Sequence, residues 1–129
     1  MAMAVGRLKR RQDFLRVAGA QRKCATPSLV LQARPAPEDE SLRGVRPRVG
    51  FTASRKVGGA VERNRARRRL RAAVRQVMPA HAAPDHDYVV IARTGTLTRA
   101  FPALLGDLET ALKRLGTYRD GGASARRGA

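Results

Sequence analysis

The stretch that decides the fold runs from Arg55 to Arg75 and reads RKVGGAVERNRARRRLRAAVR. Seven of the fourteen residues from position 62 onward are arginine, a density that is also typical of a disordered basic tail. Apolar residues nevertheless recur at the spacing of one face of an α-helix, at Ala66, Leu70, Ala73, Val74 and Val77. This stripe predicts a packed helix from about residue 60 to residue 78, ending before Pro79.

The opposite face of the predicted helix is strongly cationic. At about 100° per residue it carries Asn64, Arg67, Arg68, Arg71 and Arg75, with Arg65 and Arg69 along one flank. Like charges three or four positions apart repel by a few tenths of a kcal/mol per pair, so the clustering destabilises the helix unless a polyanion neutralises it. Arginine is a planar, bidentate donor to phosphate, and the chain contains 23 arginines against 4 lysines. The face therefore indicates a partner that bears phosphates.

The bulk properties agree with this reading. A chain of 129 residues with 43% hydrophobic content is most simply one domain with a modest core. Its formal charge of +17 and pI near 11.8 predict a strong, salt-sensitive attraction to nucleic acid or another polyanion. Because the sequence has no apolar run of 18 residues and no apolar signal core, we expect a cytoplasmic protein with no membrane partner. Cys24 is the single cysteine, which excludes an intramolecular disulfide.

Hydrophobic periodicity predicts the remaining elements. We expect helices at about 12–18 and 99–115, strands at 28–33, 48–54 and 88–93, and a short edge strand within 21–25. The strands at 28–33 and 48–54 should pair as an antiparallel hairpin across a proline-rich loop at 35–47. Gly116 should end the last helix. The pattern predicts an α+β fold, a two-layer sandwich of a small, mostly antiparallel sheet with helices. We assign residues 1–6 to a flexible N-terminus, 7–118 to one domain and 119–129 to a disordered basic tail.

The sequence offers no constellation suited to catalysis. Glu38, Asp39 and Glu40 lie together in the proline-rich loop, where a solvated acidic turn is the simpler interpretation. The adjacent residues Asp85, His86 and Asp87 are poorly spaced to converge on one metal ion. Gly58 and Gly59 precede the basic helix but lack the rest of a nucleotide-binding loop. We therefore predict an RNA-binding domain with no catalytic or metal-binding residues of its own.

Four short motifs in order carry a resemblance to a known family. They are Lys56-Val57-Gly58, Ala60-Val61, Arg63-Asn64-Arg65 and Arg68-Arg69-Leu70-Arg71, with agreeing flanks at 7–14, 48–51 and 87–93. Together they resemble the protein subunit of bacterial ribonuclease P over residues 7 to 115. The resemblance implies a fold like the second domain of ribosomal protein S5, with a left-handed strand-helix-strand crossover. A parallel unit of this kind over residues 48–93 would ordinarily be right-handed.

The resemblance also implies an activity, the endonucleolytic removal of the 5′ leader from precursor tRNA. The reaction is carried by a partner catalytic RNA with Mg²⁺ bound mainly by that RNA and the substrate, so the protein is an accessory subunit without an obligate protein partner. The residues expected to contact the catalytic RNA are Lys56, Arg63, Asn64, Arg65, Arg67, Arg68, Arg69 and Arg71. Those expected in a cleft for the single-stranded leader are Phe14, Gln32 and Arg55.

Several alternatives stay open at this stage. From the sequence pattern alone Phe14 reads first as a core residue, and only the resemblance places it in the cleft. Stacking in the cleft is expected to be weaker where Ala18 and Gln32 replace the aromatics of many relatives. Gly59 also replaces the family's commoner asparagine. A structural RNA-binding protein of the ribosomal type, with no role in cleavage, would share the composition and the basic helix. A membrane-surface helix is disfavoured, because the small apolar face built on Ala66 and Ala73 is a poor insertion surface.

Overall fold

The arginine-rich stretch forms α3, Ala60–His81, as its apolar stripe predicts. Ala66, Leu70 and Ala73 are completely buried. The predicted end before Pro79 is wrong, since the helix continues to His81. Pro79 has no N–H, so the last turn of the helix loses one backbone hydrogen bond. The helical pattern resumes after it, since the Ala82 N–H donates to the Met78 carbonyl at 3.0 Å.

The computed structural model describes residues 4–36 and 47–120. The predicted acidic turn at 38–40, positions 1–3 and the tail beyond 120 lie outside these residues. The remaining elements are β1 (Gly6–Arg7), α1 (Arg11–Gly19), β2 (Lys23–Ala25), β3 (Leu29–Pro35), β4 (Arg48–Thr52), β5 (His86–Ala92), α4 (Thr94–Thr98) and α5 (Phe101–Arg114).

The sheet has five strands in the order β1-β4-β5-β3-β2. The predicted hairpin between 28–33 and 48–54 is wrong, because β5 lies between β3 and β4. β3 pairs with β5 in antiparallel fashion over seven residues, and β4 pairs with β5 in parallel. The apolar run of β5 suits this central place, where Tyr88, Val89 and Val90 are buried on the two faces of the strand. The sheet is therefore mixed, and its longest pairing is antiparallel.

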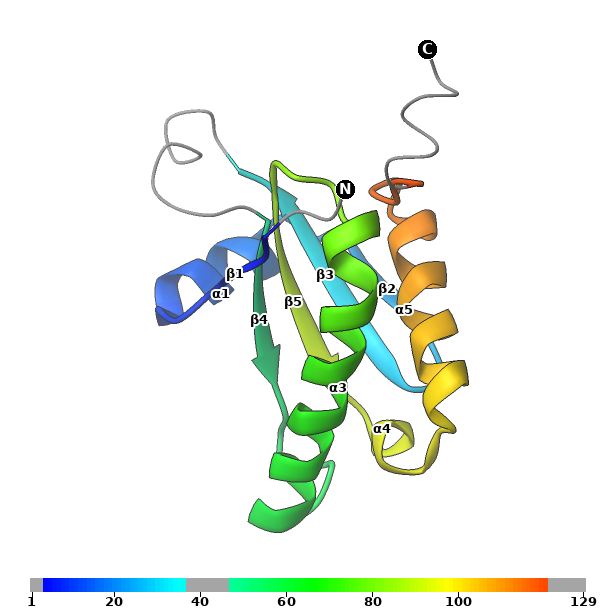
Figure 1. The fold of residues 1–129 in the computed structure, drawn as a ribbon. Coiled ribbons are helices and arrows are strands. Elements are labelled where there is room, and N and C mark those ends of the chain that lie inside the picture. Colours follow the sequence, from blue (N-terminus) through cyan, green and yellow to red (C-terminus); the bar gives the residue numbers. More distant parts are fainter. Residues whose placement is uncertain (1–3, 37–46, 121–129) are drawn as a thin grey trace.

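The β4-α3-β5 unit is left-handed, as the resemblance implies. In Figure 1 both strands run downward, α3 lies in front of the sheet, and β5 lies to the right of β4. A right-handed crossover would put β5 on the other side of β4.

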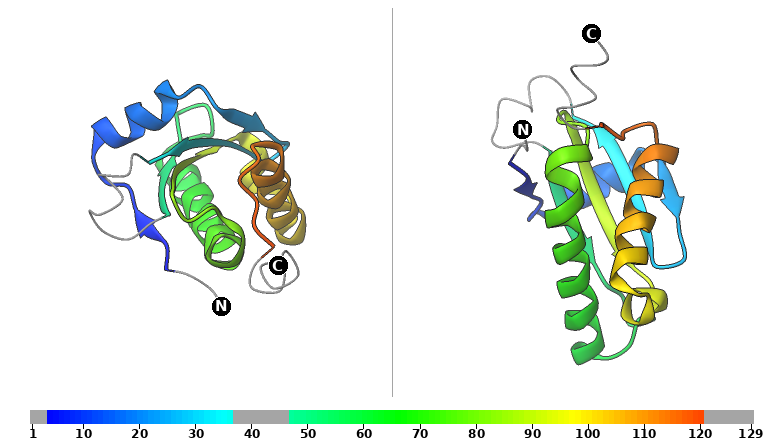
Figure 2. Two further views of the ribbon diagram at one scale, coloured as in Figure 1. Left: turned by 90° about the horizontal axis from the view of Figure 1, so that it is seen from above. Right: turned by 45° about the vertical axis from the view of Figure 1, so that its right-hand side comes forward.

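Helices cover the two faces of the sheet unequally. Seen from above, α3 and α5 lie side by side on one face, and α1 lies on the other (Figure 2). The α3–α5 side holds the main core, whose largest buried side chains include Tyr88, Leu31 and Leu104. Under α1 lies a smaller cluster built on Leu8, Val17 and Val89. The architecture is the predicted helix-on-sheet layer with α1 added as a partial third layer.

The edges of the sheet and the ends of the helices differ in how closely they follow the sequence pattern. The edge strand is confirmed as β2, and Gly116 ends the last helix with a φ of +74°. The helix predicted from residue 99 begins at Phe101 and is preceded by α4, which the sequence did not predict. Gly6, assigned to the flexible N-terminus, instead pairs with Arg48 in β1.

Candidate nucleic-acid interface

The turn that leads into α3 fixes the direction of the basic helix. Gly58 has a φ of +145°, and a Cβ added there would lie 2.7 Å from the Cβ of Glu62. The Glu62 carboxylate accepts a hydrogen bond from the Gly59 N–H at 2.9 Å, which satisfies a free donor at the helix start and suits the helix dipole. The N-terminal turns of α3 then project past the end of the sheet (Figure 1).

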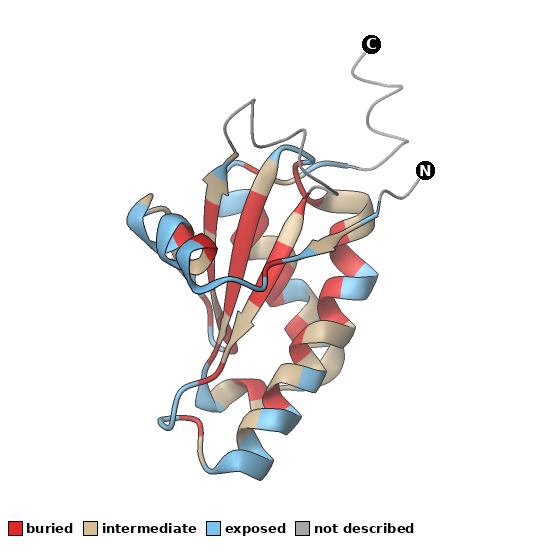
Figure 3. Cartoon of the chain, turned by 90° about the vertical axis from the view of Figure 1, so that its left-hand side faces the viewer, coloured by how far each residue is buried: buried red, intermediate tan, exposed pale blue. Residues whose placement is uncertain are grey.

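The predicted RNA-contacting residues are distributed along this helix and its approach. Exposed members are Lys56, Asn64, Arg65 and Arg68, and the half-buried members are Arg63, Arg67, Arg69 and Arg71. Exposed surface is concentrated on this end of α3 and on the outer side of α1 (Figure 3). Within residues 4–36 and 47–120, the ion pairs of the structure involve no arginine of α3. The cations of the helix are thus left without internal neutralisation.

Two of these side chains are oriented by neighbours on the same helix. Arg67 donates from Nη1 to the Asn64 Oδ1 at 3.1 Å, and the Arg63 Nε donates to the Gly59 carbonyl at 3.4 Å. The Asn64 amide therefore holds the Arg67 guanidinium on the exposed side of the first helical turns. Each guanidinium keeps further N–H groups for an external acceptor.

Arg69 has a different environment from the other arginines. Its Nη1 donates to the Leu97 carbonyl at 3.2 Å and its Nη2 to the Arg99 carbonyl at 2.5 Å. These acceptors lie at the C-terminal end of α4, where carbonyl groups lack helical partners. Arg69 is thereby committed to joining α3 to the α4–α5 connection, a role that no sequence pattern indicates.

The predicted leader-cleft residue Phe14 lies on the opposite face of the sheet. Its ring packs directly on β4, because a Cβ at Gly50 would lie 2.5 Å from two ring carbons. The ring is half-buried beside the cluster under α1, which also includes Ile91 at its margin. Beyond α1, Val30, Ile91 and Thr52 lie in register across β3, β5 and β4 and are partly exposed. Phe14 therefore borders an apolar strip of open sheet.

Gln32 and Arg55 do not share a pocket with Phe14. Gln32 lines a hollow of about 340 Å³ at the end of α1, together with Ala18 and Lys23. Arg55 is exposed in the turn that follows β4. The structure thus brings Phe14 and Gln32 to the same face of the sheet but to different hollows, since Phe14 lines one of about 510 Å³ with Lys9, Phe51 and Arg67, and it leaves Arg55 outside both.

A buried chain of charges holds α1 against the sheet. Arg48 donates from Nε and Nη2 to both oxygens of Asp87, at 3.0 and 2.9 Å. Its Nη1 also lies 3.7 Å from Asp13 of α1, and Arg34 lies 3.7 Å from Asp87. Asp13 and Asp87 are only 3% and 0% exposed. Since Phe14 follows Asp13 in the chain, this network fixes the place of the aromatic ring.

The acidic residues considered as metal ligands have other partners. Asp87 belongs to the charge network, and Asp85 accepts a hydrogen bond from His86 at 2.9 Å that lowers the pKa of the Asp85 carboxyl. The described part of the chain contains no group of three His, Cys, Asp or Glu side chains placed to hold a metal ion.

Near these residues, burial raises the pKa of Tyr88, whose hydroxyl accepts a hydrogen bond from the Ala83 N–H at 3.0 Å. Among the described residues, no helix is long and apolar enough to cross a membrane.

Comparison with known sequences points in one direction. The family model described as Ribonuclease P matches residues 4–116. The "Ribonuclease P protein component" of Paramagnetospirillum magneticum is 59% identical over 119 residues, covering 92% of this chain and 89% of the relative. That of Caulobacter vibrioides is 50% identical over 116 residues, covering 90% of this chain and 74% of the relative.

Solved structures agree with the sequence matches. The RNase P protein of Staphylococcus aureus superposes with a TM-score of 0.69 at 26% identity, covering 88% of this chain and 97% of that one. The RNase P protein from Thermotoga maritima gives a TM-score of 0.67 at 27% identity, covering 84% and 96%.

Proposed function

The chain belongs to the bacterial ribonuclease P protein family, and from that premise we propose that it binds the catalytic RNA and the 5′ leader of precursor tRNA. In doing so it assists the RNA-catalysed, Mg²⁺-dependent removal of the leader, acting in the cytoplasm. The protein is an RNA-binding component of a tRNA-processing ribonucleoprotein, and its own residues bind and orient rather than cleave.

The observation that carries the proposal is the unneutralised face of α3. Arg65 and Arg68 are exposed and, among the described residues, pair with no carboxylate. Repulsion along the helix is relieved when phosphates lie between the guanidiniums, so RNA binding and helix stability favour each other. Lys56 and Asn64 extend this surface over the turn before the helix and its first residues.

The leader is assigned to the other face of the sheet. The strip formed by Val30, Ile91 and Thr52 is open, and Phe14 borders it with a half-buried ring. A base stacked on an aromatic ring gains roughly 1–3 kcal/mol whatever its identity. Such binding suits a substrate class whose leaders differ in sequence. The strip lies on the face of the sheet away from α3, and the two proposed surfaces meet at the hollow that Phe14 lines with Phe51, Arg67 and Arg71.

The assignment of catalysis to the RNA rests on how the buried carboxylates are used. Asp13 and Asp87 are paired with arginines, and Asp107 accepts bonds from Ser28 and Arg99. A carboxylate held in this way is a poor general base or metal ligand. When bound by the RNA and substrate, Mg²⁺ supplies the activation of the attacking water.

The test of the proposal is a reconstitution at low, near-physiological Mg²⁺. Cleavage of a precursor tRNA is measured with a bacterial ribonuclease P RNA alone, with this protein alone, and with both. We expect efficient cleavage only in the combined reaction. Activity of the protein alone would reveal an active site in the chain, and absence of stimulation would favour a structural RNA-binding role.

A matched pair of variants tests the α3 surface within the same assay. Arg68→Ala should weaken binding of the catalytic RNA and reduce the slope of log K against log salt by about one phosphate contact. Arg114→Ala removes the same charge from an exposed position in the last turn of α5 and should leave the slope unchanged. Equal slopes for the two variants would remove Arg68 from the interface.

A further inference from the structure

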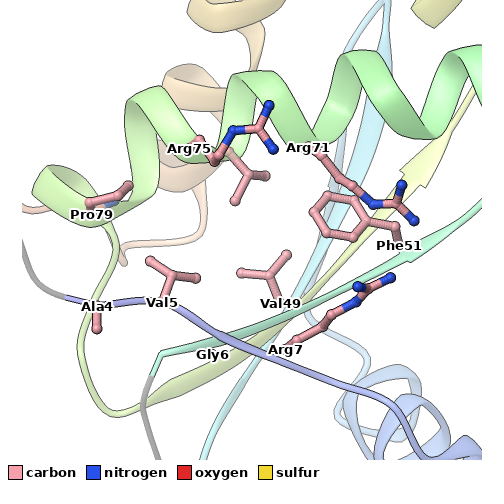
Figure 4. Close-up of a pocket in the computed structure, with 10 residues that line it drawn as sticks. Ala4, Val5, Gly6, Arg7, Val49, Phe51, Arg71, Arg75 and Pro79 are labelled. Atoms are coloured by element: carbon pink, nitrogen blue, oxygen red, sulfur yellow. The ribbon is translucent and has the colours of Figure 1, made fainter.

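A groove that no sequence motif indicates runs along the β1 edge of the sheet, between β1 and α3 (Figure 4). It encloses about 430 Å³. We refer to it as the edge groove. Its floor is apolar and is formed by Val5, Val49, Phe51 and Val74. Phe51 is half-buried, so part of its ring is open to a ligand. The volume is typical of a site for a small molecule or a single nucleotide unit.

The rim of the edge groove is cationic. Arg7 and Arg71 reach toward its Phe51 end from opposite sides (Figure 4), and Arg75 lies one helical turn further along α3. The Arg71 guanidinium carbon lies 5.7 Å from the centre of the Phe51 ring. Within the described residues, no carboxylate pairs with Arg7, Arg71 or Arg75.

Arg71 shows a sign of an unfilled interaction. Its Nε is buried and has no hydrogen-bond partner among the described residues. A buried donor without an acceptor is unfavourable. If the Arg71 side chain reorients so that its Nε meets an acceptor on a ligand, that cost is removed, and ligand binding is favoured. An adjoining hollow of about 510 Å³ shares Arg7, Phe51 and Arg71 with the edge groove and is also lined by Leu8, Lys9, Phe14 and Arg67. The positive rim therefore continues onto the exposed face of α3.

An aromatic floor with guanidinium groups at the rim fits a nucleotide whose base is unpaired. The base can lie against Phe51 and the guanidinium plane of Arg71, while its phosphates meet Arg7 and Arg75. A base in a duplex is stacked on both sides and cannot enter. A fatty acyl chain would match the floor but not the three cations, and an acidic peptide would match the cations but not the flat aromatic contact.

We propose that the edge groove receives one unpaired nucleotide of the catalytic RNA. This inference rests on the proposed function and deepens it. The catalytic RNA is the source because Arg71 and Arg75 belong to α3, the helix assigned to that RNA, and because Val49 and Phe51 face α3. The strip assigned to the leader lies on the other face of β4.

Two variants test the edge groove by different properties. Phe51→Leu keeps an apolar side chain but removes the aromatic surface, and should weaken binding of a bacterial ribonuclease P RNA roughly 5- to 100-fold. Arg75→Ala changes an exposed residue, so it should leave folding unaffected while lowering the salt slope by about one. Arg114→Ala is the control, and circular dichroism with thermal unfolding establishes that each variant is folded.

Ultraviolet crosslinking of the reconstituted complex locates the nucleotide. Trypsin releases residues 49–55, which contain Phe51, as one peptide. Mass spectrometry should find this peptide joined to one unpaired nucleotide of the catalytic RNA, and the crosslink should disappear in Phe51→Leu. A crosslink to the tRNA leader instead, or adducts spread over many nucleotides, would overturn the proposal.

The two proposals fail in distinguishable ways. If cleavage is stimulated and Arg68→Ala weakens binding, but folded Phe51→Leu and Arg75→Ala bind like Arg114→Ala, the edge groove is not a nucleotide site. If the unaltered protein neither binds the catalytic RNA nor stimulates cleavage, the proposed function itself is wrong.

Discussion

Replacing Arg48 with methionine should test whether the buried charge network positions α1. The side chain of Arg48 is 16% exposed and makes a two-point contact with Asp87, whose side chain is 1% exposed. Methionine has a similar length and no charge, so the substitution removes the ionic contacts with little change in volume. It leaves two buried carboxylates, Asp87 and Asp13, short of a partner.

The magnitude follows from what remains around those carboxylates. Removing one partner of a buried ion pair costs about 3–5 kcal/mol. Arg34 stays 3.7 Å from Asp87, and Arg10 and Arg16 stay 3.5 Å from Asp13. Because these contacts compensate in part, we expect a loss of about 3 kcal/mol in the free energy of unfolding. For a domain of this size that corresponds to a fall in Tm of about 12 °C.

The matched control is Arg10→Met. Arg10 also contacts Asp13, at 3.5 Å, but its side chain is 65% exposed. An exposed pair of this kind is worth at most about 1 kcal/mol, so the control should be close to the unaltered protein. Both variants lose one positive charge, which keeps the general electrostatic attraction to RNA the same.

Two assays together decide the outcome. Urea unfolding followed by circular dichroism gives the free energy of unfolding. Binding of precursor tRNA by the reconstituted complex shows whether Phe14, which follows Asp13, has lost its place. We expect Arg48→Met to lower the affinity for leader-bearing precursor more than the affinity for mature tRNA. A stability loss no greater than that of Arg10→Met would refute the reasoning that the network is desolvated and positions α1.

Three further perturbations test other parts of the molecule. Phe14→Leu should weaken binding of leader-bearing precursor roughly 5- to 100-fold and leave the affinity for mature tRNA unchanged. An equal loss of affinity for both would show that Phe14 acts as a core residue. Gly58→Ala should lower the free energy of unfolding by about 1–3 kcal/mol, because its φ is +145° and Glu62 crowds the added Cβ. Gly59→Ala, at a φ of −77°, is the control, and an equal loss there would exclude backbone strain as the cause. For Tyr88, burial raises the folded pKa above 10.0, so its contribution to stability is complete below pH 10 and is lost as the pH rises beyond it. The unfolding free energy measured from pH 8 to 11 should fall less steeply in Tyr88→Phe, and parallel profiles would show that another group controls alkaline unfolding.

The sequence predicted the helix elements that carry a strong period. The stripe through Ala66, Leu70 and Ala73 predicts α3 because a packed helix needs one apolar face whatever covers it. The helix end was misplaced at Pro79 because a proline near the last turn costs only one hydrogen bond there. α4 was missed, since five residues reading TGTLT contain no helical stripe and are held by contacts from elsewhere in the chain.

Strand pairing was not predictable from local pattern. Alternation along 48–54 shows which side chains share a face, but not which strand lies beside it. β5 enters between β3 and β4 only after α3 has been traversed. Its fully apolar run was the available sign of a central position, and it argues against the hairpin that we expected from chain order.

Local sequence pattern also predicts some of the candidate functional residues and misses others. Residue type and spacing predicted that α3 would present a cationic face, but could not distinguish Arg68 from Arg69. The two are adjacent arginines, yet Arg68 is exposed while Arg69 meets the carbonyls that end α4. Arg7, Phe51 and Arg75 come from three separate segments, so no motif unites them before the chain folds.

The strand β4 contributes to both of the surfaces that we propose for RNA binding. Its side chains alternate, so Val49 and Phe51 face α3 whereas Arg48 and Gly50 face α1. The first pair forms part of the floor of the edge groove, and the second anchors α1 and receives the Phe14 ring. Both proposed RNA surfaces therefore depend on one five-residue strand, and they meet at the hollow that Phe14 and Phe51 both line. A change that shifts β4 along its neighbours by one residue would exchange these faces and disrupt both surfaces together.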